Sequence, residues 1–109
     1  MKTISPTALA QWLLDADTAR ARPQLLDVRE PWEYETCHLA GSIHVPMGEI
    51  PARVAEVDPD LPVVCICHHG ARSAQVAFFL ESQGVRDAFN LSGGLEAWAL
   101  QVDHSFPRY

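Results

Sequence analysis

Residues 63–80, VVCICHHGARSAQVAFFL, limit the folds open to this chain more than any other stretch. The apolar run up to Cys67 is typical of a strand that is buried on both faces, as strands of parallel sheets are. After the glycine of this stretch, Val76, Ala77 and Leu80 recur at helical spacing on one face. A buried strand that passes through a short loop into a helix predicts a βαβ unit.

The same alternation of strands and helices runs through the rest of the chain. Further strands are predicted at 24–28, 41–46 and 87–91, and further helices after Ser5-Pro6, at 30–35, at 48–57 and from Gly93 to Trp98. This order predicts an α/β fold: a three-layer sandwich with a central, mostly parallel sheet of about five strands, flanked by helices. A chain of 109 residues that is 48% hydrophobic is expected to form a single domain over residues 1–109.

The formal net charge of −6 argues against two classes of partner. Lys2 is the only lysine, and the basic residues form no stripe, so neither nucleic acid nor an anionic membrane surface is expected as a partner. No apolar run approaches the ~20 residues that span a bilayer. Residues 1–23 contain no apolar core of the kind found in a signal peptide.

Cysteine usage indicates the redox environment. The chain has three cysteines, Cys37, Cys65 and Cys67, and the last two are too close in sequence for an ordinary disulfide. An odd number of cysteines leaves at least one free thiol. A reducing compartment, the cytoplasm, is therefore the expected location.

The loop after the predicted central strand brings a thiol to a place that suits an anion. Ligands bind at the carboxyl ends of parallel strands, and Cys67 would be the last strand residue. Converging N–H groups of the loop and the dipole of the helix that begins near Arg72 favour a thiolate at their focus. Gly70 allows a left-handed backbone and close approach of a ligand. Arg72 supplies a guanidinium that could hold an anionic substrate.

Other residues of this stretch have simpler interpretations. Cys65 lies two residues before Cys67 on the same face of the strand, and buried cysteines pack as small hydrophobic side chains. His68 and His69 are typical of loop residues that hydrogen-bond to backbone, and they are also candidates for a direct part in the chemistry. The sequence alone does not choose between these two interpretations of the histidines.

Four stretches, in this order, resemble the rhodanese family, specifically its single-domain members: LLDVREPWEYETCHLAGSIHVP, VVCICHHGARS, VRDAFNLSGG and GGLEAWA. Together they cover residues 25–99. The resemblance implies a rhodanese-like fold and a sulfurtransferase activity. In that family the cysteine of a C-x-x-G-x-R loop takes a sulfane sulfur as a persulfide and passes it to a thiophilic acceptor. Cys67, Gly70 and Arg72 match this loop.

The resemblance also assigns the remaining site residues. It makes Cys67 the catalytic residue and the rest of the loop the substrate-binding residues: His68, His69, Gly70, Ala71, Arg72 and Ser73. Asp27, Arg29 and His38 match family elements that are mainly architectural and lie near the site. It implies a small anionic donor, such as thiosulfate or a persulfide, and a thiol, protein-thiol or cyanide acceptor, with neither metal nor cofactor. The sequence departs from the family in two places: Cys37 replaces a glycine and puts a thiol outside the expected site, and the His68-His69 pair leaves substrate preference open.

Three other functions compete with sulfur transfer. Cysteine-based phosphatases place five residues between cysteine and arginine, whereas four lie between Cys67 and Arg72 and six between Cys65 and Arg72. A structural metal site is disfavoured because C-I-C-H-H lacks the C-x₂₋₄-C spacing of a zinc knuckle. A non-catalytic binding module stays open, since an intact loop does not prove turnover. The sequence leaves the physiological donor, the acceptor and the oligomeric state undetermined.

Overall fold

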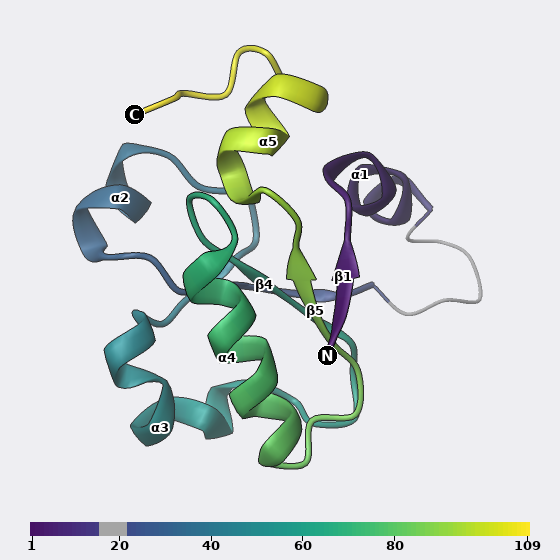
Figure 1. The fold of residues 1–109 in the computed structure, drawn as a ribbon, viewed down its shortest axis with the longest axis vertical. Coiled ribbons are helices and arrows are strands. Elements are labelled where there is room, and N and C mark those ends of the chain that lie inside the picture. The colour runs from purple at the N-terminus through teal and green to yellow at the C-terminus, as the bar shows by residue number, and fades with distance from the viewer. Residues whose placement is uncertain (16–21) are drawn as a thin grey trace.

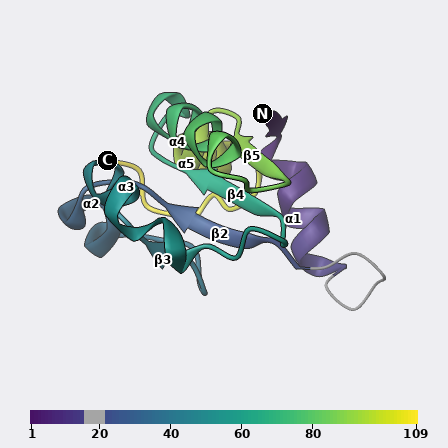
Figure 2. The ribbon, with the colours of Figure 1, turned by 90° about the horizontal axis from the view of Figure 1, so that it is seen from below.

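The computed structural model describes residues 1–15 and 22–109, and in this part of the chain five strands form one sheet. The strands are β1 (Lys2–Ile4), β2 (Gln24–Asp27), β3 (Ile43–His44), β4 (Val63–Ile66) and β5 (Ala88–Leu91). Their order is β1-β5-β4-β2-β3, and every neighbouring pair is parallel. Figure 2 shows β5, β4, β2 and β3 following one another across the sheet. The predicted parallel α/β sheet is confirmed.

Helices cover both faces of this sheet. They are α1 (Pro6–Leu14), α2 (Pro31–Thr36), α3 (Ile50–Arg53), α4 (Ala71–Ser82) and α5 (Gly94–Gln101), with short 3₁₀ turns η1 (Met47–Glu49) and η2 (Val54–Glu56). Alternate residues of β4 separate the two faces, because successive strand side chains point to opposite sides. Val63 and Cys65 pack with α3 and α4, whereas Val64 and Ile66 pack with α1 and α5. The three-layer sandwich is confirmed (Figure 1).

The sequence pattern does not predict β1, and it misplaces several boundaries, among them the end of β4, which is Ile66 rather than the predicted Cys67. β1 is an edge strand whose first two residues are exposed, so it lacks a continuous apolar run, and among the described strands it pairs with β5 alone. The strand predicted at 41–46 is confined to Ile43–His44, since Gly41 lies in a turn at φ +80° and Pro46 follows. Helix α5 runs past Trp98 to Gln101. None of the described helices is both long enough and apolar enough to cross a membrane.

Candidate active site

Cys67 follows β4 directly, at the carboxyl end of the sheet. Its sulfur accepts hydrogen bonds from two backbone amides, the Gly70 N–H at 3.0 Å and the Ser73 N–H at 3.4 Å. The second amide belongs to the first turn of α4, whose dipole adds positive potential at this end. The loop from 67 to 73 therefore forms a cup of N–H groups that stabilises negative charge on sulfur.

Two glycines let this loop close tightly. Gly70 adopts φ +102°, a left-handed conformation that suits glycine and starts α4. A Cβ on Gly94 would collide with the carbonyl oxygens of Cys67 and His68. These two carbonyls accept hydrogen bonds of 2.9 and 3.1 Å from amides in the first turn of α5. The loop is thus held from one side by α4 and from the other by α5.

A buried hydroxyl and a buried amide continue the polar contacts of the sulfur. Ser73 Oγ lies 3.2 Å from Cys67 Sγ and 2.5 Å from Asn90 Oδ1, and all three residues are buried. Ser73 has one hydroxyl hydrogen, which it donates to Asn90. In this arrangement Ser73 Oγ is an acceptor for the Cys67 thiol. When the sulfur is ionised, the same hydroxyl can turn to donate to it.

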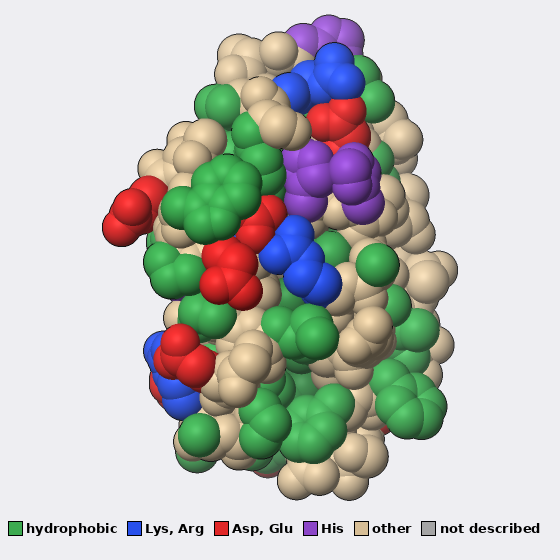
Figure 3. Space-filling model, turned by 60° about the vertical axis from the view of Figure 1, so that its left-hand side comes forward, with side chains coloured by type: hydrophobic (Ala, Val, Ile, Leu, Met, Phe, Trp, Pro, Cys, Tyr) green, Lys and Arg blue, Asp and Glu red, His purple; other side chains and the backbone are tan. Residues whose placement is uncertain are grey.

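The Cys67 sulfur is buried as well as hydrogen-bonded to the loop amides. Cys67 is 1% exposed, so a donor reaches it only after side chains at the rim of the loop move. His69 and Ala71 form the exposed part of that rim, while His68 and Arg72 are half-buried. Figure 3 shows histidine side chains beside basic and acidic ones on this face, above a region of hydrophobic side chains.

His68, the residue after Cys67, has a ring whose surroundings favour its neutral form. Burial and the neighbouring His69 lower the pKa of His68. The two rings meet edge to face, with centroids 4.1 Å apart. Within the described residues, Nδ1 of His68 is buried without a hydrogen-bond partner. No group of three or more His, Cys, Asp or Glu side chains in residues 1–15 and 22–109 is placed to hold a metal ion.

Arg72 has a protein partner that the sequence did not indicate. Its guanidinium donates two hydrogen bonds, of 2.7 and 2.9 Å, to the two carboxylate oxygens of Glu33 on α2. Glu33 is buried, and one-third of the Arg72 side chain is exposed (34%). Arg72 was predicted to hold an anionic substrate, and in the structure its guanidinium is paired with the Glu33 carboxylate. The ion pair also ties the start of α4 to α2.

The free energy of unfolding should fall at acid pH, because the Glu33 carboxylate then becomes protonated. Arg72 lowers the pKa of this carboxyl from its ordinary value of 4.5 to about 2, and further hydrogen bonds from Tyr109 and Glu30 act in the same direction. A carboxyl with a lowered pKa in the folded state adds stability that is complete above pH 4.5 and is lost as the pH falls toward 2. The difference amounts to about 3 kcal/mol.

Urea denaturation between neutral pH and pH 2 measures this contribution. The free energy of unfolding should fall across that window, and it should fall less steeply in the Glu33→Gln protein, which has no carboxyl to titrate at this position. Equally steep curves for the two proteins would show that Glu33 is not a source of the acid sensitivity.

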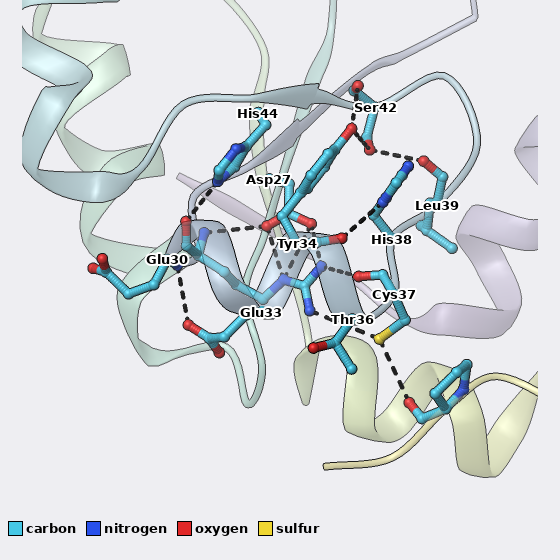
Figure 4. A network of polar contacts seen from close by, with 12 residues as sticks. Asp27, Glu30, Glu33, Tyr34, Thr36, Cys37, His38, Leu39, Ser42 and His44 are labelled. Carbon is cyan, nitrogen blue, oxygen red and sulfur yellow. Dashed lines mark hydrogen bonds and ion pairs between the residues drawn. The ribbon is translucent and has the colours of Figure 1, made fainter.

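Asp27 and Arg29 form a buried ion pair behind the loop. The Arg29 Nε and Nη2 groups lie 2.9 and 2.7 Å from the Asp27 carboxylate oxygens, and both residues are at most 1% exposed. Burial opposes the charge of Arg29, but hydrogen bonds to Asp27 and Tyr109 raise its pKa above the ordinary value. The guanidinium also donates to the Cys37 carbonyl at 2.5 Å. Figure 4 shows Asp27 and Cys37 within this network.

His38 lies apart from the sulfur. Its Nδ1 is 2.8 Å from the Tyr34 carbonyl, and its ring stacks on Tyr34 with centroids 3.9 Å apart. His44 stacks on the other side of the same ring at 4.3 Å (Figure 4). The structure therefore places Asp27 and Arg29 behind the site, and it places His38 in a stack that braces the end of α2.

Three residues of the site were missed from sequence: Glu33, Asn90 and Tyr109. A polar side chain in the apolar strand AFNL was a usable signal for Asn90. Glu33 carried no such signal, because its place at the start of a helix already explains a carboxylate there. Tyr109 reaches the site from 76 residues beyond Glu33, to which its hydroxyl donates at 2.8 Å.

A five-stranded parallel α/β sheet with an amide-lined cysteine after its central strand defines a class of cysteine-loop domains. The model of one family in this class, the rhodanese-like domain, matches residues 6–101, and the chain belongs to that family.

Relatives and solved structures agree with this family. The thiosulfate sulfurtransferase GlpE of Pseudomonas syringae pv. syringae is 38% identical over 74 residues, which are 68% of this chain and 70% of that protein. The chloroplastic rhodanese-like/PpiC domain-containing protein 12 of Arabidopsis thaliana is 39% identical over 90 residues, 79% of this chain and only 30% of that protein. The crystal structure of SSP1007 from Staphylococcus saprophyticus has a TM-score of 0.82 at 30% identity, covering 99% of this chain and 100% of that one.

Proposed function

We propose that this protein is a sulfurtransferase. It moves sulfane sulfur from thiosulfate or a persulfide donor to a thiol or cyanide acceptor through a persulfide on Cys67. The observation that carries the proposal is the pair of amides, from Gly70 and Ser73, that point at the Cys67 sulfur. The relative named thiosulfate sulfurtransferase, of which the chain spans 70%, supports the same reaction class.

The first half-reaction loads the enzyme. The Cys67 thiolate attacks the outer sulfur of thiosulfate, a new S–S bond forms, and the bond to sulfite breaks with its electron pair leaving on sulfite. The product is an anionic persulfide, Cys67–S–S⁻. The amides and the Ser73 hydroxyl that favour the thiolate also stabilise this anion, since its negative charge lies in the same cup.

The second half-reaction returns the enzyme to its starting state. A thiolate or cyanide attacks the terminal sulfur, the S–S bond to Cys67 breaks, and the electron pair returns to Cys67 as a thiolate. In the proposal the loop residues His68, His69, Gly70, Ala71, Arg72 and Ser73 surround the entering anion. Because Glu33 neutralises Arg72, the backbone amides and the α4 dipole take the larger share of anion binding, and Arg72 chiefly holds the loop to α2.

The proposal also includes the chemical class of the sulfur donor and the compartment in which the reaction takes place. A small anion such as thiosulfate or a persulfide suits a cup of N–H groups, and the acceptor is a thiol or cyanide. All three cysteines are free thiols in the structure. We place the reaction in a reducing, cytoplasmic setting, where thiol acceptors are abundant.

One observation favours a second candidate, a non-catalytic rhodanese-like binding module. Cys67 is 1% exposed, which would suit a sulfur that never meets a donor. Intact mass after incubation with thiosulfate separates the two functions. A sulfurtransferase gains the mass of one sulfur atom and loses it again when cyanide is added. A protein that gains no mass, even at high thiosulfate concentration, would be the binding module.

A further inference from the structure

The last three residues, 107–109, return from α5 to the candidate site. Figure 1 shows the end of the chain passing from α5 toward α2. The Tyr109 hydroxyl donates to Glu33 at 2.8 Å and accepts from Arg29 Nη1 at 2.9 Å. The Cys37 thiol lies 3.7 Å from the Pro107 carbonyl, and Arg108 pairs with Glu96 on α5. Contacts from α2, α5 and the buried ion pair therefore fix this segment.

The ring of Tyr109 reaches from α2 to the cysteine loop. Its centroid lies 4.2 Å from that of His68, the residue after Cys67, and 5.6 Å from that of Trp32 on α2. The Tyr109 hydroxyl and the Arg72 guanidinium donate to the same carboxylate, that of Glu33. The Tyr109 ring thus contacts both the cysteine loop and α2, and Cys67 of that loop is buried.

The phenol keeps its hydrogen bonds through the neutral pH range. Burial raises the pKa of Tyr109 to about 12, and the hydrogen bond to Glu33 acts in the same direction. The hydroxyl therefore remains a donor to the Glu33 carboxylate. Both of its hydrogen bonds join it to a charged group, and such bonds are stronger than neutral ones. Tyr109 is 38% exposed, so part of its ring faces solvent beside His68 of the loop.

We propose that Tyr109 determines which acceptors reach Cys67: its ring narrows the approach, admitting cyanide and small thiols and holding back peptide-sized and protein thiols. This inference rests on the proposed sulfur transfer and deepens it, because it names the acceptor class. Replacing the ring with a methyl group should widen the approach between His68 and the Glu33–Arg72 pair. The increase in the rate of reaction at Cys67 should be confined to large reactants, since small reactants already reach the sulfur.

Alkylation of Cys67 tests the access without any need for turnover. Tyr109→Ala is compared with the parent protein, using iodoacetamide as the small reagent and fluorescein maleimide as the large one, and peptide mass mapping assigns the label to residue 67. The ratio of large-reagent to small-reagent rates should rise about tenfold in Tyr109→Ala. Tyr109→Phe keeps the ring but loses both hydroxyl hydrogen bonds, so its ratio should rise much less than that of Tyr109→Ala. An unchanged ratio in Tyr109→Ala, or an equal rise in Tyr109→Phe, would overturn the proposal.

Turnover with two acceptors completes the test. The ratio of kcat/KM for glutathione to kcat/KM for cyanide should rise in Tyr109→Ala, and a ratio equal to that of the parent would contradict the assignment of acceptor class. If the parent transfers sulfur to neither acceptor, the proposed function fails. The alkylation ratio still decides whether Tyr109 limits access.

Discussion

Cys67→Ser is expected to abolish sulfur uptake from thiosulfate and to leave the fold intact. A serine hydroxyl stays protonated in this cup and cannot form the S–S bond of a persulfide. The new oxygen would meet the amides of Gly70 and Ser73, so the buried hydroxyl keeps hydrogen-bond partners. The free energy of unfolding should therefore change by no more than about 1 kcal/mol. Intact mass after incubation with thiosulfate measures the first effect, and urea denaturation measures the second.

Cys65→Ser is the matched control, because it makes the same atomic exchange two residues earlier. Cys65 is fully buried in the apolar layer under α4, and burial raises the pKa of its thiol to about 12, so it is no nucleophile at neutral pH. This variant should keep sulfur uptake and lose about 1–3 kcal/mol, the cost of burying a hydroxyl among apolar groups. Sulfur uptake that survives in Cys67→Ser and disappears in Cys65→Ser would reassign the nucleophile.

The parts of the fold that follow from local patterns were predictable. The apolar run of β4, the glycine that starts α4 and the alternation of strands with helices give the parallel sheet and its two helical layers. The edge strand β1 was not predictable in this way. Its place depends on pairing with β5, nearly the whole length of the chain away, and its own three residues carry no periodic signal.

In the candidate site, too, the features that are local in sequence were predictable and those that depend on distant residues were not. The cysteine loop was visible because its amides, its glycine and its sulfur lie within residues 67–73. Its partners come from elsewhere: Glu33 lies 39 residues from Arg72, and Asn90 lies 17 residues from Ser73. Arg72 shows the effect of such distant partners. The arginine near a helix start predicts an anion, and the anion that it meets in the fold is a carboxylate of the same chain.

Asp27→Ala should remove a large share of the stability of the fold. Arg29 would remain buried with the Cys37 carbonyl, the Cys37 sulfur and the Tyr109 hydroxyl as acceptors, none of them a carboxylate, and an uncompensated buried charge costs about 3–5 kcal/mol. Domains of this size are stable by only about 5–15 kcal/mol, so a large fraction of that margin would be lost. The measurement is urea denaturation, in which the midpoint should fall while the slope with denaturant stays constant.

Glu56→Ala provides the comparison, since it also removes the carboxylate of an ion pair with arginine. Glu56 pairs with Arg53 on the surface, where water solvates both groups after the pair is broken. Its loss of stability should be much smaller than that of Asp27→Ala. Equal losses in the two variants would mean that water or another acceptor compensates Arg29 once Asp27 is gone. A large loss confined to Asp27→Ala would show that the buried pair secures the end of β2, and with it the guanidinium that holds Tyr109 against the cysteine loop.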